Sequence, residues 1–86
     1  MYLYRIYTEY RPNLNEIAAH WLDGFTIIRG DGYYQGQHEQ SAVIEYMSNF
    51  QVPNRIRGLC TQITELNKQR EVKVIRIDSR SFNVRA

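Results

Sequence analysis

The chain is predicted to form one α+β domain in which two helices cover one face of a four-stranded antiparallel sheet. Three observations support this fold class. Four segments are rich in β-branched and aromatic residues, two segments between them carry apolar residues at helical spacing, and their order along the chain is βαββαβ. With 86 residues, 43% of them hydrophobic, the chain has room for a single core and is too apolar to be disordered.

The first half of this pattern runs from residue 2 to residue 24. Aromatic and β-branched residues predict a strand over Tyr2 to Tyr10, which Arg11-Pro12-Asn13 ends. Asn13 followed three residues later by Glu16 resembles a capping box, so a helix is expected to begin there, and Gly24 is expected to end it in a left-handed turn. The apolar face of this helix consists of Leu14, Ile17, Ala18, Trp21 and Leu22.

The second half contains a strand pair, a helix and a last strand. Strands are predicted over Phe25 to Ile28, closed by Gly30-Asp31-Gly32, and over Gln40 to Met47. They are expected to form a hairpin with an irregular, glycine-bearing connection. A second helix is predicted from Pro53 to about Gln69 and a last strand over residues 72–77, while residues 79–86 form a tail of uncertain order.

Right-handed crossovers place both helices on the same face of the sheet, which is the ferredoxin-like layout. The other face is then left without cover. Seven tyrosines in 86 residues are more than a two-helix core can easily hide, because each hydroxyl needs a partner or water. An exposed amphipathic sheet face in so small a domain usually binds another subunit, so a homo-oligomer is expected.

Charge and hydropathy exclude several classes of partner. The net charge is only +2 and no basic block is present, so nucleic-acid binding is not expected. No apolar run approaches the roughly 20 residues that span a bilayer, so no membrane partner is expected either. Arg5 interrupts the apolar stretch at the N-terminus and no small-residue cleavage site follows, so a cytoplasmic protein is predicted.

Cysteine and histidine usage does not indicate a metal or redox site. Cys60 is the single cysteine and lies on the apolar face of the second helix, so it is expected to be a core residue. His20 and His38 are 18 positions apart and are interpreted as solvent-facing or hydrogen-bonded residues. Neither a metal nor a cofactor is expected.

The most unusual stretch of the chain runs from Gly30 to Ser41. Its three glycines allow close approach of a ligand to the backbone, and Tyr33, Tyr34 and Glu39 stand nearby. The alternative interpretation is a long hairpin loop with a bulge. Gly30-Asp31-Gly32 lacks the Lys-Ser/Thr of a phosphate-binding P-loop and is a weak nucleotide signature.

Three segments together resemble a known family: Gly24-Phe25-Thr26-Ile27 through Gly32-Tyr33-Tyr34, then Glu39-Gln40-Ser41-Ala42-Val43-Ile44-Glu45, then a helix ending near Lys68-Gln69-Arg70-Glu71-Val72-Lys73-Val74. This pattern is similar to that of the phage S-adenosylmethionine (SAM) lyases, formerly called SAM hydrolases. The resemblance implies a PII-like fold, a homotrimer and a SAM site between subunits. It also implies that Tyr34 is the active-site tyrosine and Glu39 the catalytic carboxylate.

The implied reaction suits a protein this small. The carboxylate of SAM attacks its own Cγ and expels the sulfonium, giving homoserine lactone and 5′-methylthioadenosine without a metal, an activated water or a covalent residue. Glu39 and Tyr34 would offset the positive charges of the substrate. The expected substrate-binding residues are Tyr33, Gly32 and a first-strand tyrosine of a neighbouring subunit, which is Tyr7 or, as alternatives, Tyr4 or Tyr10. Glu45 is interpreted as solvated or paired across a subunit boundary.

Three functions remain open on the sequence. The leading hypothesis is a phage-encoded SAM lyase that acts in the host cytoplasm on SAM or a SAM-derived nucleotide and counters host restriction. The second is a non-catalytic PII-like protein that senses or sequesters an adenine nucleotide at a subunit interface. The third is an interaction protein that uses its open sheet face or sheet edge against a macromolecule.

Overall fold

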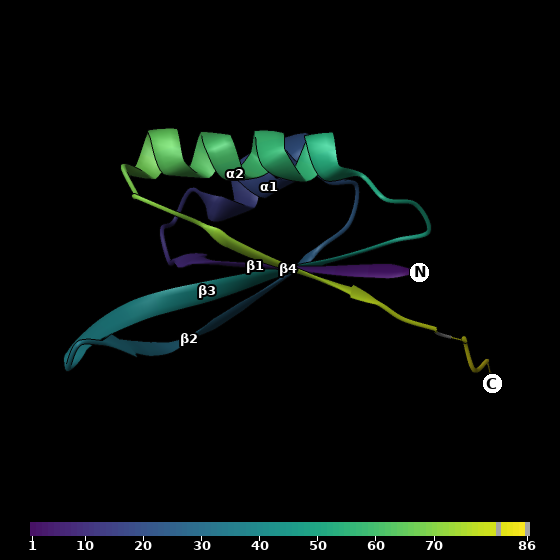
Figure 1. Ribbon diagram of the computed structural model, residues 1–86, viewed down its shortest axis with the longest axis horizontal. Coiled ribbons are helices and arrows are strands. Elements are labelled where there is room, and N and C mark those ends of the chain that lie inside the picture. Colours follow the sequence, from purple (N-terminus) through teal and green to yellow (C-terminus); the bar gives the residue numbers. More distant parts are fainter. Residues whose placement is uncertain (81, 86) are drawn as a thin grey trace.

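The chain folds as a two-layer α+β domain (Figure 1). The computed structural model describes residues 1–80 and 82–85, and the side chain of Tyr34 also lies outside its described part. The elements follow in the predicted order: β1 Tyr2–Glu9, α1 Leu14–Trp21, β2 Thr26–Tyr34, β3 Gln37–Ser48, α2 Pro53–Asn67 and β4 Lys73–Asp78. The strands pair antiparallel in the order β2-β3-β1-β4, with both helices on one face. This is the ferredoxin-like arrangement, and the predicted fold class is confirmed.

The core lies between the sheet and the helices because alternate residues of the central strands point toward the helices. Tyr4 and Ile6 of β1 stand opposite Tyr46 and Ile44 of β3, and all four are buried. Both buried tyrosines have partners for their hydroxyls: the Val52 N–H donates to Tyr4 and Arg55 Nη1 donates to Tyr46, each at 3.1 Å. The helices contribute the residues that their spacing predicts, Leu14, Ile17 and Ala18 from α1 and Ile56, Leu59 and Ile63 from α2.

The expected irregular connection between β2 and β3 is wrong. The two strands pair without interruption from Thr26 opposite Glu45 to Tyr34 opposite Gln37, so the stretch holds no bulge. Only Gln35 and Gly36 form the turn, with φ of 51° and 77°. Two central residues with positive φ define the tight hairpin turn whose twist matches the strands, and Gly36 takes that conformation without strain. The other glycines of the stretch, Gly30 and Gly32, are therefore strand residues.

The expected start of α1 is confirmed, with Asn13 at the N-cap, but the capping-box bond and the expected end at Gly24 are wrong. The Asn13 side chain makes no cap bond; its Nδ2 donates to Asn67 Oδ1 of α2 at 2.8 Å, and its Oδ1, the atom that a capping box would use, has no partner among the described residues. At the other end Leu22 turns extended, with φ of −120°, which brings its side chain into the core. Gly24 takes no positive φ; the left-handed residue is Lys68, after α2.

The sheet face opposite the helices carries both apolar residues and an ion pair. Ile28, Met47, Ile75 and Ile77 are large hydrophobic residues exposed on it. Arg5 Nε donates to Glu45 Oε2 at 2.8 Å across β1 and β3, and this hydrogen bond and the charge of Glu45 raise the pKa of Arg5. The expectation of a solvated or intersubunit Glu45 is therefore wrong, because register puts Arg5 directly beside it.

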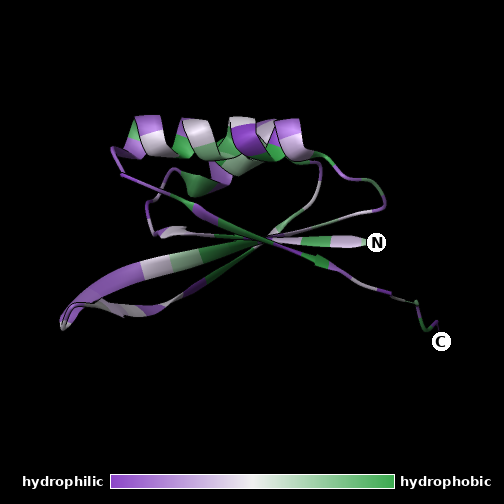
Figure 2. Ribbon diagram, in the orientation of Figure 1, coloured by the Kyte–Doolittle hydropathy of each residue, from purple (hydrophilic) through white to green (hydrophobic). Residues whose placement is uncertain are grey.

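Hydropathy differs along the sheet (Figure 2). Apolar residues lie where the strands cross beneath the helices, while the far end of the β2–β3 hairpin is hydrophilic. After β4 the chain leaves the domain body, with Ser79 N–H bonded to the Met1 carbonyl at 2.9 Å and Phe82 and Val84 exposed. In the described residues, no helix is long and apolar enough to cross a membrane.

Candidate functional site

A hollow of about 960 Å³ lies beside the end of β1. The pairing of β1 with β3 ends at Glu9 opposite Ser41, whereas β2 and β3 continue to pair with each other as far as Tyr34 and Gln37. The outer part of the hairpin therefore projects beyond β1 (Figure 1). Segment 68–73, which joins α2 to β4, forms the opposite wall. The hollow exists because a tight turn extends the hairpin, which the sequence analysis did not foresee.

Four of the five predicted site residues line this hollow: Tyr7, Gly32, Tyr33 and Glu39. Gly32 and Glu39 stand directly opposite each other in the hairpin. The backbone of Tyr34 pairs with Gln37, but its side chain is outside the described part of the structure. Of the alternatives to Tyr7, Tyr4 is buried in the core, and the ring of Tyr10 lies under the guanidinium of Arg29, 3.8 Å from its centroid. Tyr7 is therefore the tyrosine of β1 that reaches the hollow.

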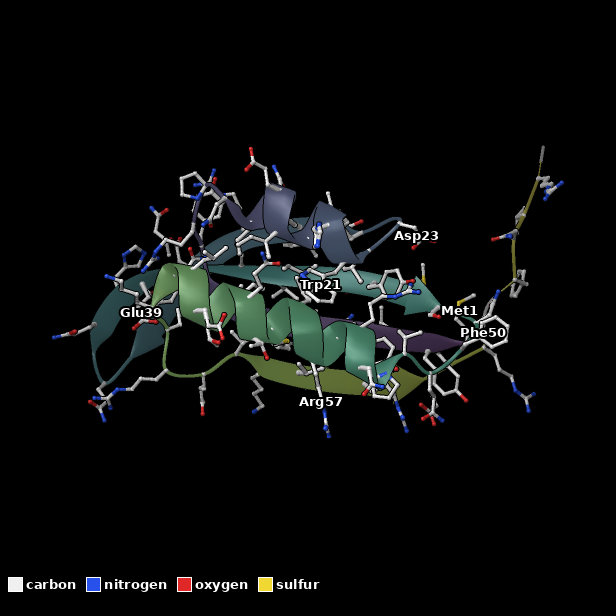
Figure 3. All side chains as sticks on the ribbon, turned by 90° about the horizontal axis from the view of Figure 1, so that it is seen from above. Met1, Trp21, Asp23, Glu39, Phe50 and Arg57 are labelled. Carbon is white, nitrogen blue, oxygen red and sulfur yellow. The ribbon has the colours of Figure 1, made fainter. Side chains whose placement is uncertain are left out.

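Glu39 is a carboxylate of the hollow without a side-chain partner among the described residues. Viewed from above, it lies by the C-terminal end of α2 (Figure 3). No hydrogen bond or ion pair joins it to another described residue, whereas the nearby Glu9 is bound by Arg11 Nη2 at 2.6 Å. An unneutralised carboxylate at the edge of a hollow can attract a positively charged group.

The opposite wall supplies positive charge that the sequence analysis did not assign to the site. Lys68, Arg70 and Lys73 line the hollow together with Glu71. The left-handed conformation of Lys68, with φ of 54°, turns the chain away from α2 at this point. The run from Lys68 to Lys73 is visible in the sequence as a segment in which four of six residues are charged. Only the fold brings it opposite Glu39.

Gln69 ties this wall to the end of β1. Its Oε1 accepts hydrogen bonds from Thr8 Oγ1 at 2.8 Å and from the Glu9 N–H at 3.3 Å. Its Nε2 is buried and has no partner in the part of the chain that the structure describes. A buried N–H group normally finds an acceptor, so this amide is an unsatisfied donor inside the wall.

A polar contact between His38 and Asp31 lies next to the Tyr33 ring. His38 Nε2 and Asp31 Oδ1 are 2.8 Å apart, and the rings of His38 and Tyr33 have centroids 5.3 Å apart. The interpretation of His38 as a hydrogen-bonded residue is confirmed. Across the described residues, no group of three or more His, Cys, Asp or Glu side chains is placed to hold a metal ion.

Comparison with known proteins finds similar proteins by structure alone. No protein-family model matches the chain, and no curated protein matches it. A DUF3240 family protein from Shewanella baltica OS155 superposes with a TM-score of 0.62 at 11% identity, over 99% of this chain and 97% of that one. The de novo designed protein Foldit4 superposes with a TM-score of 0.52 at 15% identity, over 92% of this chain and 96% of that one. The likeness extends to the fold alone.

Proposed function

We propose that the protein is a SAM lyase and that its reaction takes place in the hollow beside β1. The observation that carries the proposal is Glu39, a carboxylate without a cationic partner in the same hollow as Tyr7 and Tyr33. SAM presents a sulfonium and an ammonium to such a site, and aromatic faces favour both its adenine and its cationic centre.

The reaction needs little from the protein beyond shape and charge. A carboxylate oxygen of SAM forms a bond to Cγ, the bond from Cγ to sulfur breaks, and the electron pair leaves with sulfur as a neutral thioether. No proton is transferred and no water is consumed. The protein must fold SAM so that oxygen, carbon and sulfur are in line, which is a contribution of positioning. Glu39 would hold the ammonium, and a cation of the opposite wall would orient the carboxylate.

Closure of the hollow is proposed to require other copies of the chain. Tyr33 is 75% exposed and Tyr7 37% exposed, so a single chain shields a ligand poorly. The chain exposes 6648 Å², whereas a compact monomer of 10.3 kDa is expected to expose about 5,400 Å². The excess of about 1,250 Å² is larger than the roughly 800 Å² per partner of one standard interface, so it leaves room for burial against another copy. A homotrimer, in which each chain makes two interfaces, is proposed from the resemblance to the SAM lyases.

A second function is favoured by a different observation. Lys68, Arg70 and Lys73 would suit the phosphates of an adenine nucleotide. In that case the protein would bind the nucleotide without turnover, as a sensor or a sink. As a lyase, in contrast, it would remove the methyl donor of a host and so protect phage DNA from methylation-dependent defence.

One experiment separates these functions. Purified protein is incubated with SAM, and the products are analysed for 5′-methylthioadenosine and homoserine lactone. In water labelled with ¹⁸O, early lactone should carry no label because its ring oxygen comes from the substrate carboxylate. Label in the first product would indicate hydrolysis instead. Tight binding of ATP or AMP without any turnover of SAM would favour the sensor.

Glu39→Gln tests the central residue. The substitution keeps the shape and removes the charge, so binding of the cationic substrate should weaken about ten- to a hundredfold while thermal stability stays near that of the wild type. Glu16→Gln, on the exposed side of α1, is the matched control and should retain full activity. Full activity of Glu39→Gln would refute the assignment of this residue.

A further inference from the structure

The outer part of the β2–β3 hairpin holds a cluster of three side chains that the proposed chemistry does not use directly. Asp31 and Tyr33 are alternate residues of β2, and His38 stands opposite Tyr33 on β3. All three therefore project from the same face of the hairpin. His38 Nε2 is 2.8 Å from Asp31 Oδ1, and the His38 ring contacts the Tyr33 ring at a tilt of 60°.

Tyr33 needs support in order to act as a wall of the hollow. It is 75% exposed, so core packing does not fix its ring. His38 is the aromatic neighbour found for it in the described part of the chain. The imidazole is in turn fixed by Asp31, which accepts a hydrogen bond from His38 when Nε2 carries a proton. Asp31 therefore holds the His38 ring, and His38 in turn holds the Tyr33 ring at the wall of the hollow.

We propose that the Asp31–His38 pair is a positioning device that holds the Tyr33 ring in place as a stacking wall for the adenine base of the ligand. The inference rests on the proposed function for the identity of the base, since both candidate ligands carry adenine. Fixing an exposed ring before binding removes part of the entropy that the ligand would otherwise lose on ordering it, typically worth about two- to tenfold in affinity per side chain.

The cluster is separate from the charged part of the hollow. Glu39 follows His38 in sequence but points to the opposite face of β3, where it stands by Gly32. Lys68 and Arg70 belong to the other wall. Changes at Asp31 or His38 should therefore alter how the base is held without altering the charge that attracts the rest of the ligand.

The test uses 5′-methylthioadenosine, an uncharged adenine nucleoside, as the probe, with its dissociation constant measured by calorimetry. The variants are Tyr33→Leu, His38→Ala, Asp31→Ala, Asp31→Asn and the double variant Tyr33→Leu with His38→Ala. We expect His38→Ala and Asp31→Ala to weaken binding two- to tenfold, and Asp31→Asn, which keeps an acceptor for Nε2–H, to restore most of the affinity. In the Tyr33→Leu background, His38→Ala should have no further effect.

The outcomes decide between positioning and general stability. The proposal would be overturned if His38→Ala lowered the affinity for the probe equally with and without Tyr33, or if His38→Ala bound the probe as tightly as the wild type. It would also be overturned if the wild type did not bind the probe at millimolar concentration. Unchanged melting temperatures verify that each variant folds. Coupling between His38 and Tyr33 in a protein that never cleaves SAM would uphold the positioning device and refute only the lyase.

Discussion

In two glutamates of β3, the residue opposite each one decides whether its carboxylate is paired or free. Glu39 and Glu45 lie on the same face of β3, and neither has a lysine or arginine next to it in sequence. Register places Arg5 beside Glu45, which neutralises it at 2.8 Å, while Gly32 stands opposite Glu39 and offers no side chain. One carboxylate is therefore structural, and the other is free to act on a ligand.

Cys60 gives a prediction at the same scale. It packs against the core, and burial raises its pKa from 9.0 to about 11. At pH 8 the reactive thiolate should then be about a hundredfold rarer in the folded than in the unfolded protein. Iodoacetamide labelling followed by mass spectrometry should be slower by about that factor without denaturant. Equal rates with and without denaturant would contradict the burial.

The same pKa fixes the sign of a pH effect on stability. Between pH 9 and 11 the unfolded thiol ionises while the folded one stays neutral, so the contribution of Cys60 is complete below pH 9 and is lost as pH rises through this window. Cys60→Ala should therefore flatten the fall in the free energy of unfolding over this range.

At the scale of elements, the two helices approach each other closely at Gly58. Trp21 of α1 lies over this position of α2, and its Nε1 donates to Gln62 Oε1 at 2.6 Å. A Cβ at Gly58 would be 2.4 Å from Trp21 Cζ3. A glycine in mid-helix costs about 1 kcal/mol relative to alanine, so here its missing side chain serves the contact between the helices.

Gly58→Ala should destabilise the protein in spite of the better helix propensity of alanine. The overpacking against Trp21 costs about 1–3 kcal/mol, which meets or exceeds the gain of about 1 kcal/mol. Chemical denaturation measures the difference. Gly24→Ala is the control, because no atom lies within 4 Å of its added Cβ, and it should change stability by less than about 0.5 kcal/mol. A Gly58→Ala protein more stable than the wild type would disprove the close approach.

The hairpin turn yields a second prediction for an element. Gly36 has φ of +77°, so Gly36→Ala should cost about 1 kcal/mol of stability and loosen the outer hairpin, while Gly36→Asn should cost less. Since the hairpin carries both Gly32 and Glu39, ligand affinity should fall with the alanine variant. Gly30→Ala, whose Cβ would meet only Ser41 Oγ at 3.9 Å, serves as the control in both measurements.

For the whole molecule, the open sheet face and the large exposed surface lead to a prediction about assembly. Light scattering should give about three times the single-chain mass of 10.3 kDa. Met47→Lys places a charge on the open face, where Met47 is 63% exposed, and should lower the mass toward one chain. Leu66→Lys, on α2 at 56% exposure, should leave the mass unchanged. A monomeric wild type would refute assembly through the open sheet face, and a dimeric one would refute the homotrimer.

The order of the elements and most of the core follow from local patterns. Ile17 and Ala18, or Leu59 and Ile63, recur with the period of a helix, and the alternation around Ile6 and Ile44 has the period of a strand. Such periods depend only on near neighbours in sequence. They therefore predicted the ferredoxin-like layout. Tyr7, Gly32, Tyr33 and Glu39 line one hollow, and their roles as site residues stay a prediction.

Contacts between distant residues were decided by the tertiary structure. The Asn13 side chain is hydrogen-bonded to Asn67, 54 positions away, and Arg5 forms an ion pair with Glu45, 40 positions away. The charged wall from Lys68 to Lys73 faces Glu39 only because α2 ends where the extended hairpin projects past β1. Residue type and spacing give the chemistry available to each side chain. Which groups meet depends on strand register and helix packing, because these set distances that no local pattern contains.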